Sequence, residues 1–168
     1  MFAEAWRAST NERAQRGRGG VEPAGDVYRI MRVAYPGAFV AMLVEGTLRG
    51  TSPPAAVLAG AGLFAAAKGL KWWAIRALGP FWTFRVIVVP GARLVASGPY
   101  RWLRHPNYIG VLGELAGAAL MTGALLSGMA GIATFGWLLT RRISLEERAL
   151  REAARPAAAT SKGGAASL

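Results

Sequence analysis

The chain's single histidine, His105, lies in the segment GPYRWLRHPNY (98–108), directly before a long apolar run. Pro106 suits the first position of a helix, because the N–H that proline lacks would have no partner there. His105 then becomes the helix N-cap, and Asn107 and Tyr108 fall in the first turn. The free N–H groups and the positive dipole end of such a helix can bind an anion. The segment could also simply anchor a membrane helix, since Tyr, Trp and Arg are common at the bilayer interface.

A second group of charged residues occurs later, in RRISLEERAL (141–150). Arg142 and Glu146 are four residues apart and share one face of a helix, whereas Glu147 lies about 100° further round. The same residues could form a solvated helix end with one ion pair worth a few tenths of a kcal/mol. Which interpretation holds depends on where the helices place the two groups.

The residues between the two groups predict a helical hairpin. Residues 109–140 carry one charge, Glu114. As a single helix they would extend roughly 48 Å, whereas a hydrocarbon core is about 30 Å thick. The Ser-Gly pair at 127–128 therefore predicts a turn, after which the second helix continues through 141–154. Gly113 and Gly117 have the spacing that permits close helix approach.

Such a hairpin brings its two cytoplasmic ends side by side and predicts a small polar pocket there. Anion-binding N–H groups, a carboxylate and aromatic faces would line the pocket, and they suit a zwitterionic ligand with an additional positive charge. The residues expected to face one another are Tyr100, His105, Asn107 and Tyr108 from the first segment, and Arg142 and Glu146 from the second.

The remaining apolar segments predict an all-α integral membrane protein with about four transmembrane helices, a C-terminal helical hairpin and the pocket on its cytoplasmic side. Residues 33–48 are short for a span, which needs about 20 residues. Residues 49–54 predict a turn, 55–78 a helix with a Trp- and Lys-rich interfacial end, and 81–97 an extended excursion. Basic residues cluster on one side of this arrangement, which predicts a multi-pass protein of the cell membrane with both termini in the cytoplasm.

Composition supports the membrane interpretation. The 168 residues are 53% hydrophobic and 17% charged, with a net charge of +11, whereas soluble domains carry roughly 25% charged residues. The basic residues lie at the ends of apolar segments, so the expected partners are membrane lipid and a lipophilic small molecule, not nucleic acid. The chain has no cysteine, which excludes disulfides and thiolate metal sites, and no metal site is predicted.

The paired motifs resemble the isoprenylcysteine carboxyl methyltransferase family. Its pattern is Gly-x-Tyr-x-x-x-Arg-His-Pro-x-Tyr, a helical hairpin, and then an Arg followed by a Glu-Glu pair, as in LVASGPYRWLRHPNYIG and RRISLEERAL here. The upstream segments NERAQRGRGGVE and FWTFRVIVVPGA look more like the bacterial branch, whose members often accompany type III polyketide synthases and O-methylate alkylpyrone-like lipids. The resemblance covers roughly residues 80–150.

The resemblance implies an integral-membrane methyltransferase that uses S-adenosylmethionine. Composition predicts a polar cytoplasmic arm (1–32) and a disordered tail (156–168), and with the resemblance it predicts a membrane methyltransferase domain between them (33–155). Arg142 matches the arginine assigned to the substrate and to catalysis, Glu114 is a candidate substrate-pocket residue, and Arg85 falls at a further polar cofactor contact. The implied cofactor-binding residues are Ala92, Arg93, Leu94, Val95, Tyr100, His105, Pro106, Asn107, Tyr108 and Glu146.

The predicted reaction is O-methylation of a lipophilic carboxylate or acidic enol, prenylcysteine-like or alkylpyrone-like. Such an acceptor is already ionised near neutral pH, so alignment and exclusion of water replace a strong general base. Two alternatives stay open, namely N-methylation of a phospholipid and a non-catalytic relative that binds lipid or a partner protein.

Overall fold

The computed structural model describes residues 2–92 and 95–153, so the tail predicted at 156–168 lies outside the described residues. The described residues form no β-strand; Val21 and Val88 make an isolated antiparallel bridge. The all-α prediction is therefore confirmed. The helices are α1 (Phe2–Gly17), α2 (Tyr28–Arg49), α3 (Pro54–Leu78), α4 (Pro106–Thr122) and α5 (Leu125–Ala153), with short 3₁₀ helices at Gly79–Phe81 and Gly98–Arg101.

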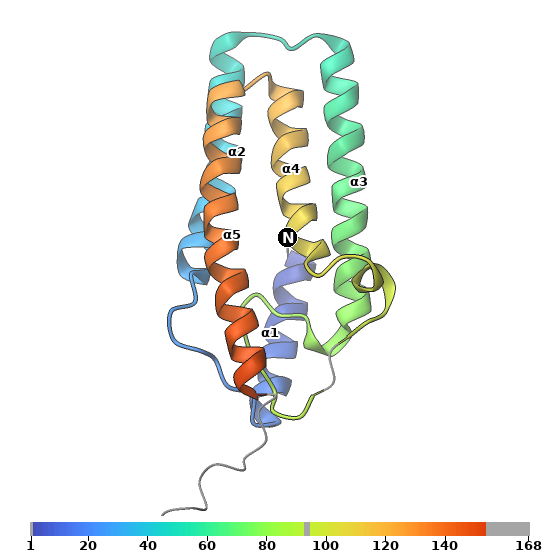
Figure 1. The fold of residues 1–168 in the computed structure, drawn as a ribbon. Helices are drawn as coiled ribbons and strands as arrows, with labels where there is room; N and C mark the ends of the chain where they lie inside the picture. The colour runs from blue at the N-terminus through green and yellow to red at the C-terminus, as the bar shows by residue number, and fades with distance from the viewer. Residues whose placement is uncertain (1, 93–94, 154–168) are drawn as a thin grey trace, which may run out of the picture.

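Helices α2 to α5 run side by side as a four-helix bundle (Figure 1). The α2–α3 and α4–α5 connections lie together at one end, which we call the turn end. Helix α1 lies at the opposite end, beneath α4, where the segment 82–92 and the last turns of α5 are also found. We call this the pocket end, because it carries the cavity described below.

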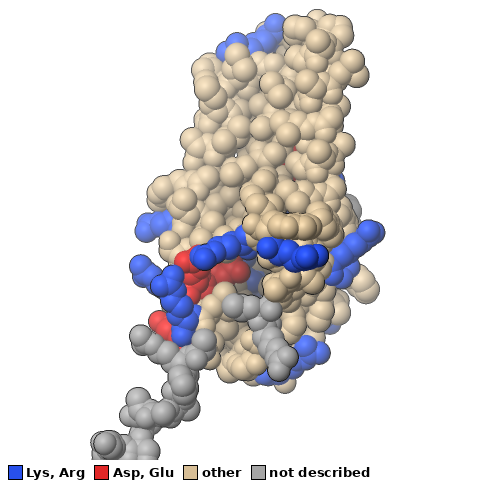
Figure 2. Space-filling model, turned by 45° about the vertical axis from the view of Figure 1, so that its right-hand side comes forward, with Lys and Arg blue, Asp and Glu red and all other residues tan. Residues whose placement is uncertain are grey.

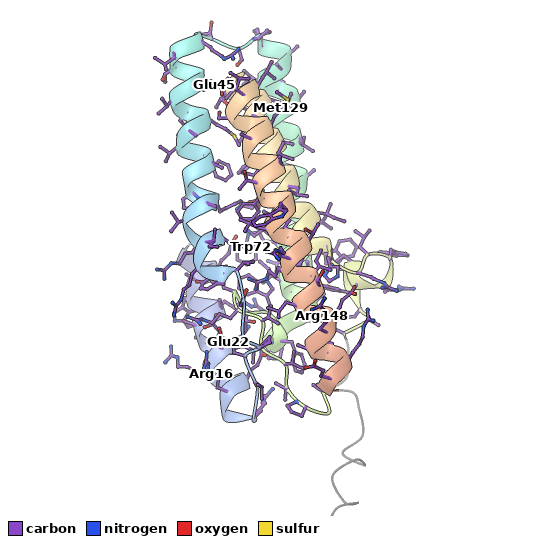
Figure 3. The ribbon with its side chains drawn as sticks, turned by 60° about the vertical axis from the view of Figure 1, so that its left-hand side comes forward. Arg16, Glu22, Glu45, Trp72, Met129 and Arg148 are labelled. Carbon is purple, nitrogen blue, oxygen red and sulfur yellow. The ribbon has the colours of Figure 1, made fainter. Side chains whose placement is uncertain are left out.

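The turn of the C-terminal hairpin lies earlier than predicted. Helix α4 ends at Thr122, and Gly123 caps it in the left-handed conformation, with φ +64, where glycine meets no steric penalty. The expected turn residue Ser127 instead lies in the first turn of α5. There its backbone N–H and hydroxyl both donate to the Glu45 carboxylate of α2, each at 2.6 Å, so a neighbouring helix supplies the cap. Figure 3 shows Glu45 at the turn end, close to the start of α5.

Helices α3 and α4 pack with their backbones in close contact. A Cβ placed on Gly117 would lie 2.7 Å from the carbonyl oxygen of Gly60, and a Cβ on Gly60 would lie 2.7 Å from the carbonyl oxygen of Gly117. One turn nearer the pocket end, Gly113 meets the Cβ of Ala67. The prediction that Gly113 and Gly117 permit close approach is confirmed, and their partner is α3. We call this contact the α3–α4 seam.

The bundle core is apolar, and its centre includes Met42, Leu115, Phe135 and Leu138. The apolar segment expected at 33–48 forms the later part of α2, which begins five residues earlier, at Tyr28. The sequence predicted about four transmembrane helices, and four long helices form the bundle. Within residues 2–92 and 95–153, however, no helix is both long and apolar enough to cross a membrane.

Helix α1 is bound to the turn that follows α3. The Asn11 side chain donates to the carbonyl oxygens of Gly79, at 2.9 Å, and Trp82, at 2.7 Å. The buried Gln15 side chain donates to the carbonyl oxygen of Pro80 at 3.0 Å. These bonds hold the start of the segment 82–88, so α1 helps to place one wall of the cavity.

Candidate functional site

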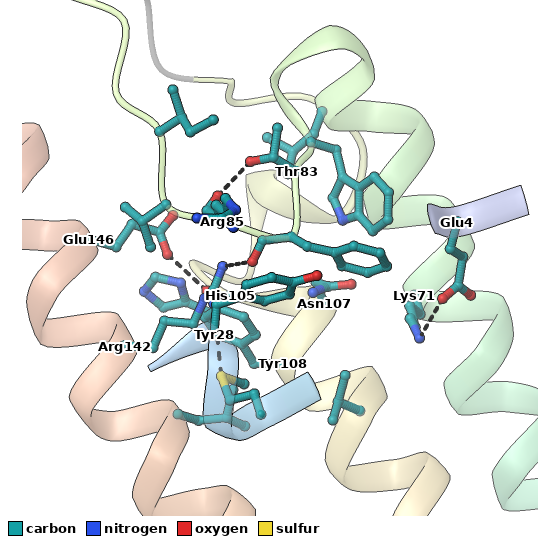
Figure 4. A pocket seen from close by; sticks show the side chains of 18 of the residues that line it. Glu4, Tyr28, Lys71, Thr83, Arg85, His105, Asn107, Tyr108, Arg142 and Glu146 are labelled. Carbon is teal, nitrogen blue, oxygen red and sulfur yellow. Dashed lines mark hydrogen bonds and ion pairs between the residues drawn. The ribbon is translucent and has the colours of Figure 1, made fainter. Parts of the chain in front are cut away.

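A cavity of about 420 Å³ lies at the pocket end, within the usual range for small-molecule sites. Residues of all five α-helices and of the segment 81–88 line it. Figure 4 shows Arg142 and Glu146 of α5 on one side of the view, Glu4 and Lys71 on the other, and Asn107 and Tyr108 between them. Most of the lining is apolar or aromatic, with a few convergent polar groups.

The two sequence motifs meet at Tyr108. Its hydroxyl donates to the Glu146 carboxylate at 3.0 Å and accepts from Nε of Arg142, also at 3.0 Å. The prediction that the two ends of the hairpin face each other is thus confirmed for this trio. Hydrogen bonds to charged partners are stronger than neutral ones, so Tyr108 fixes the relative position of the two α5 side chains.

Arg142 is 6% exposed, and all three of its guanidinium nitrogens have partners within the protein. Besides Tyr108, it contacts Asp26 through Nη1 at 3.1 Å and donates through Nη2 to the carbonyl oxygen of Phe84. It lines the cavity, yet its charge is neutralised by Asp26. The geometry therefore suits a residue that positions the walls of the cavity.

Asp26 is a site residue that the sequence analysis missed. Its carboxylate accepts from the backbone N–H of Tyr28, at 3.0 Å, and from that of Val86, also at 3.0 Å, in addition to Arg142. It thereby joins the start of α2, the segment 82–88 and α5. A lone Asp before an apolar helix is a helix-start signal, and that signal was available within the stretch 1–32.

The first turn of α4 forms as predicted. Pro106 begins the helix and His105 occupies the N-cap position. The His105 ring stacks on Tyr108, with ring centroids 5.4 Å apart and planes 12° from parallel. Oδ1 of Asn107 is buried and accepts no hydrogen bond within the described residues. An aromatic face and an unpartnered amide oxygen thus border the cavity.

Tyr100 also lines the cavity. Burial, together with the nearby Glu146 carboxylate, raises the pKa of the Tyr100 hydroxyl above its ordinary value. The phenol therefore stays protonated and can donate a hydrogen bond.

Other predicted site residues lie elsewhere. Pro106 is buried in the helix start and does not line the cavity, and neither do Ala92 and Val95. Arg93 and Leu94 lie outside the described residues. Five of the ten residues that the resemblance assigned to the cofactor, Tyr100, His105, Asn107, Tyr108 and Glu146, thus share one cavity.

Glu114 lies behind the cavity wall in a cluster of charged residues. It is fully buried, accepts a hydrogen bond from the Tyr35 hydroxyl, and contacts Nζ of Lys68 at 3.2 Å and Nζ of Lys71 at 3.5 Å. Glu4 of α1 completes the cluster, 3.1 Å from Lys71. Two carboxylates and two ammonium groups balance in charge. We call these residues and Tyr35 the Glu114 cluster.

The Glu114 cluster reaches the cavity through Glu4, Tyr35 and Lys71, which the sequence analysis did not assign to a site. They come from three helices, and neither periodicity nor motif spacing relates them. The one available signal was the presence of Lys71 and Glu114 within apolar segments, where an ionisable residue needs a partner.

Arg85 lies on the opposite wall and is held by acidic residues from the first part of the chain. Its guanidinium is 2.7 Å from Glu22 and 3.8 Å from Glu12 and lies over the Tyr28 ring. Burial opposes ionisation of Glu22, but hydrogen bonds and charge from Arg85 and Arg16 lower its pKa below the ordinary value. Arg85 thus borders the cavity with its charge already paired, and its contact with a cofactor stays a prediction.

Comparison with known proteins shows which family the chain resembles. Residues 60–152 match the model of the isoprenylcysteine carboxyl methyltransferase family. The chain is 30% identical, over 89% of both chains, to a protein of Bacillus subtilis (strain 168) titled uncharacterized protein YpbQ. It is 23% identical to an uncharacterized protein of Haemophilus influenzae, over 83% of this chain and 82% of that one. No solved structure matches significantly.

The fold and the site define an α-helical bundle with a small-molecule cavity built on a C-terminal helical hairpin. The family match covers more than half of the chain, including that hairpin and the residues that join it. The chain belongs to the isoprenylcysteine carboxyl methyltransferase family.

Proposed function

We propose that this protein is a membrane methyltransferase that uses S-adenosylmethionine to O-methylate a lipophilic carboxylate or acidic enol. The observation that carries the proposal is the convergence of Tyr108, Glu146 and Arg142 at one cavity of about 420 Å³. Family membership supports the reaction class, and the cavity supports the kind of ligand.

The residues present fit the cofactor. Its methionine part has an ammonium group and a sulfonium, and Glu146 offers a carboxylate that has no Lys or Arg within 4 Å in the described residues. The buried Oδ1 of Asn107 is a further unpartnered acceptor. Aromatic faces of His105 and Tyr108 border the same space and can contact the adenine ring or the sulfonium.

When bound, the cofactor supplies an electrophilic methyl group: the acceptor oxygen forms a new O–CH₃ bond as the S–CH₃ bond breaks, and sulfur keeps the electron pair. An ionised acceptor releases no proton, so no residue needs to act as a base. Tyr108 and Arg142 hold the Glu146 carboxylate in place, while the apolar walls exclude water. We assign Arg142 a positioning role, because Asp26 already neutralises its charge.

We propose that the turn end lies within the bilayer. Large apolar side chains are exposed there, and such surfaces mark contact with membranes or partners; they include Val40, Leu43, Leu48, Leu58, Leu126 and Met129. Figure 2 shows basic atoms at the tip of the bundle, a largely uncharged surface below them, and then a band of Lys and Arg with some acidic residues. Such a band favours contact with anionic headgroups, which supports the proposal that the pocket end faces the cytoplasm.

The proposal is tested by measuring S-adenosylmethionine binding to the purified full-length protein in a neutral detergent, using isothermal titration calorimetry. Glu146→Gln removes the unpaired carboxylate and should weaken binding at least tenfold, because it removes the charge that faces the cofactor's ammonium group. Glu152→Gln is the matched control: Glu152 lies further along α5, is exposed and does not line the cavity. It should change binding less than twofold.

Turnover is tested separately with methyl-labelled cofactor and a bacterial lipid extract. Label should move into the lipid fraction with the unaltered protein and not with Glu146→Gln. If the unaltered protein binds no cofactor, or if Glu152→Gln weakens binding as much as Glu146→Gln, the proposed function is wrong.

A further inference from the structure

An anionic acceptor needs a cation in the cavity, and five Lys or Arg residues line it. Four of them already contact a carboxylate: Lys71 with Glu4 and Glu114, Arg85 with Glu22, Arg104 with Glu147, and Arg142 with Asp26. The fifth, Arg32 of α2, has no carboxylate within 4 Å in the part of the chain that the structure describes. Among the described cations of the cavity, Arg32 is therefore the one whose charge no carboxylate of the protein neutralises.

Arg32 stands beside the apolar part of the cavity. Tyr35 and Pro36 follow it by three and four residues on α2, so they lie on the same helix face. Phe135 and Leu139 of α5 line the same cavity, and the Tyr35 and Phe135 rings are 5.4 Å apart. A charged head bound at Arg32 would thus leave an attached hydrocarbon tail against apolar and aromatic side chains.

The cavity also has an unpaired charge of the opposite sign. Glu146 accepts a hydrogen bond from Tyr108 and has no Lys or Arg within 4 Å in the described residues. An unpaired carboxylate on α5 and an unpaired guanidinium on α2 therefore face one cavity. Two ligands of opposite charge, a cationic methyl donor and an anionic acceptor, would satisfy both.

We propose that Arg32 is the specificity-determining residue for the acceptor and that it selects an amphiphile with a single carboxylate or enolate head. Its guanidinium binds the anionic oxygen. The planar guanidinium can form two parallel hydrogen bonds to a carboxylate, whereas the ammonium group of a lysine cannot. The inference rests on the proposed function and transfers the acceptor-binding role from Arg142 to a residue outside the two sequence motifs. An acceptor with an ammonium head, such as phosphatidylethanolamine, is disfavoured at this position.

The test compares Arg32→Gln with Arg29→Gln. Both arginines are exposed on α2 and three residues apart, and only Arg32 lines the cavity, so both variants remove the same surface charge. Binding of myristate and of a 6-alkyl-4-hydroxy-2-pyrone is measured by quenching of tryptophan fluorescence in a neutral maltoside detergent. Where either probe is methylated, KM and kcat are measured as well.

Arg32→Gln should raise the Kd or KM for these anionic probes at least tenfold, while Arg29→Gln changes them less than twofold. Affinity for S-adenosylmethionine should stay within twofold in both variants. Arg32→Lys should recover part of the lost affinity, because it restores the charge without the planar fork.

The inference is overturned if the two Gln variants behave alike, if Arg32→Gln weakens cofactor and acceptor equally, or if neither anionic probe binds the unaltered protein. If phosphatidylethanolamine is the lipid that becomes methylated, the inference and the proposed O-methylation both fail. In the first three outcomes the unaltered protein still binds S-adenosylmethionine, so a failure of the inference alone is distinct from a failure of the proposed function, in which cofactor binding is absent.

Discussion

Glu114 and Glu146, both on the α4–α5 hairpin, lie in opposite settings. Glu114, at the α3–α4 seam, is fully buried among Tyr35, Lys68 and Lys71, and its charge is neutralised by the protein. Glu146, at the cavity, accepts one hydrogen bond from Tyr108 and has no cation within 4 Å in the described residues. One carboxylate is satisfied by the fold, whereas the other is left for a ligand.

The difference separates charges that hold the structure from charges that serve binding. A buried charge that loses its partner is strongly destabilising, so changes in the Glu114 cluster should act on stability. An unpaired carboxylate facing a cavity is a binding candidate with a physical rationale, so changes at Glu146 should act on affinity. The four predictions below test this separation.

Glu114→Gln should have the largest effect on stability. It leaves Lys68 and Lys71 facing the single carboxylate of Glu4, and removing one partner of a buried ion pair costs about 3–5 kcal/mol. Thermal unfolding in detergent, followed by tryptophan fluorescence, measures the loss. Adding Lys68→Met restores the charge balance and should recover part of it. A loss in the free energy of unfolding below about 1 kcal/mol is typical of an exposed ion pair. Such a loss would contradict the interpretation of the Glu114 cluster as a buried, charge-balanced group.

Tyr108→Phe should destabilise less and should also weaken cofactor binding. The change removes the hydroxyl that joins Glu146 to Arg142, and hydrogen bonds to charged groups are worth roughly 1.5–3 kcal/mol. The control is Tyr28→Phe, since Tyr28 lines the same cavity and its hydroxyl makes no hydrogen bond to the described residues. Equal effects of the two variants on unfolding and on calorimetric binding would refute the joining role of Tyr108.

Gly117→Ala tests the close backbone contact of the α3–α4 seam, one turn from the buried Glu114. The added methyl group would lie 2.7 Å from the Gly60 carbonyl oxygen and 2.9 Å from the Phe64 Cβ, so α3 and α4 must separate, at about 1–3 kcal/mol. Gly62→Ala, where no atom lies within 4 Å, should be neutral or stabilising by up to about 1 kcal/mol. If the denaturation midpoints of both variants shift in the same direction, the close backbone contact between α3 and α4 is contradicted.

Glu22 should contribute the smallest effect, and only at acid pH. Its pKa is lowered in the folded protein, so its contribution to stability is present above the unfolded value of about 4.5 and is lost as pH falls through the folded value. The contribution of a partly exposed pair is below about 1 kcal/mol. Unfolding midpoints measured from pH 7 to pH 3 should fall slightly less steeply in Glu22→Gln than in the unaltered protein. An unchanged pH dependence would show that the Arg85 pair contributes no measurable stability.

The sequence predicted local features well because they depend on neighbouring residues. The helix start at Pro106, the shared face of Arg142 and Glu146, and the continuation of α5 past residue 141 all follow from helix geometry. The hairpin turn was placed at 127–128, four residues late, because a Ser-Gly pair and the glycine at Gly123 are both turn signals. The left-handed cap at Gly123 and the cap supplied by Glu45 decided between them.

The sequence by itself therefore determined an all-α chain, the meeting of two motifs across a hairpin and the chemical character of the cavity beside Tyr108. The tertiary structure alone decided which charges are neutralised. Asp26 pairs with Arg142 across 116 positions of the chain, and Glu4 joins Lys71 and Glu114 from a third helix. Periodicity reports neighbours within one helix, whereas the partner of a buried charge is chosen by packing between helices far apart in the sequence.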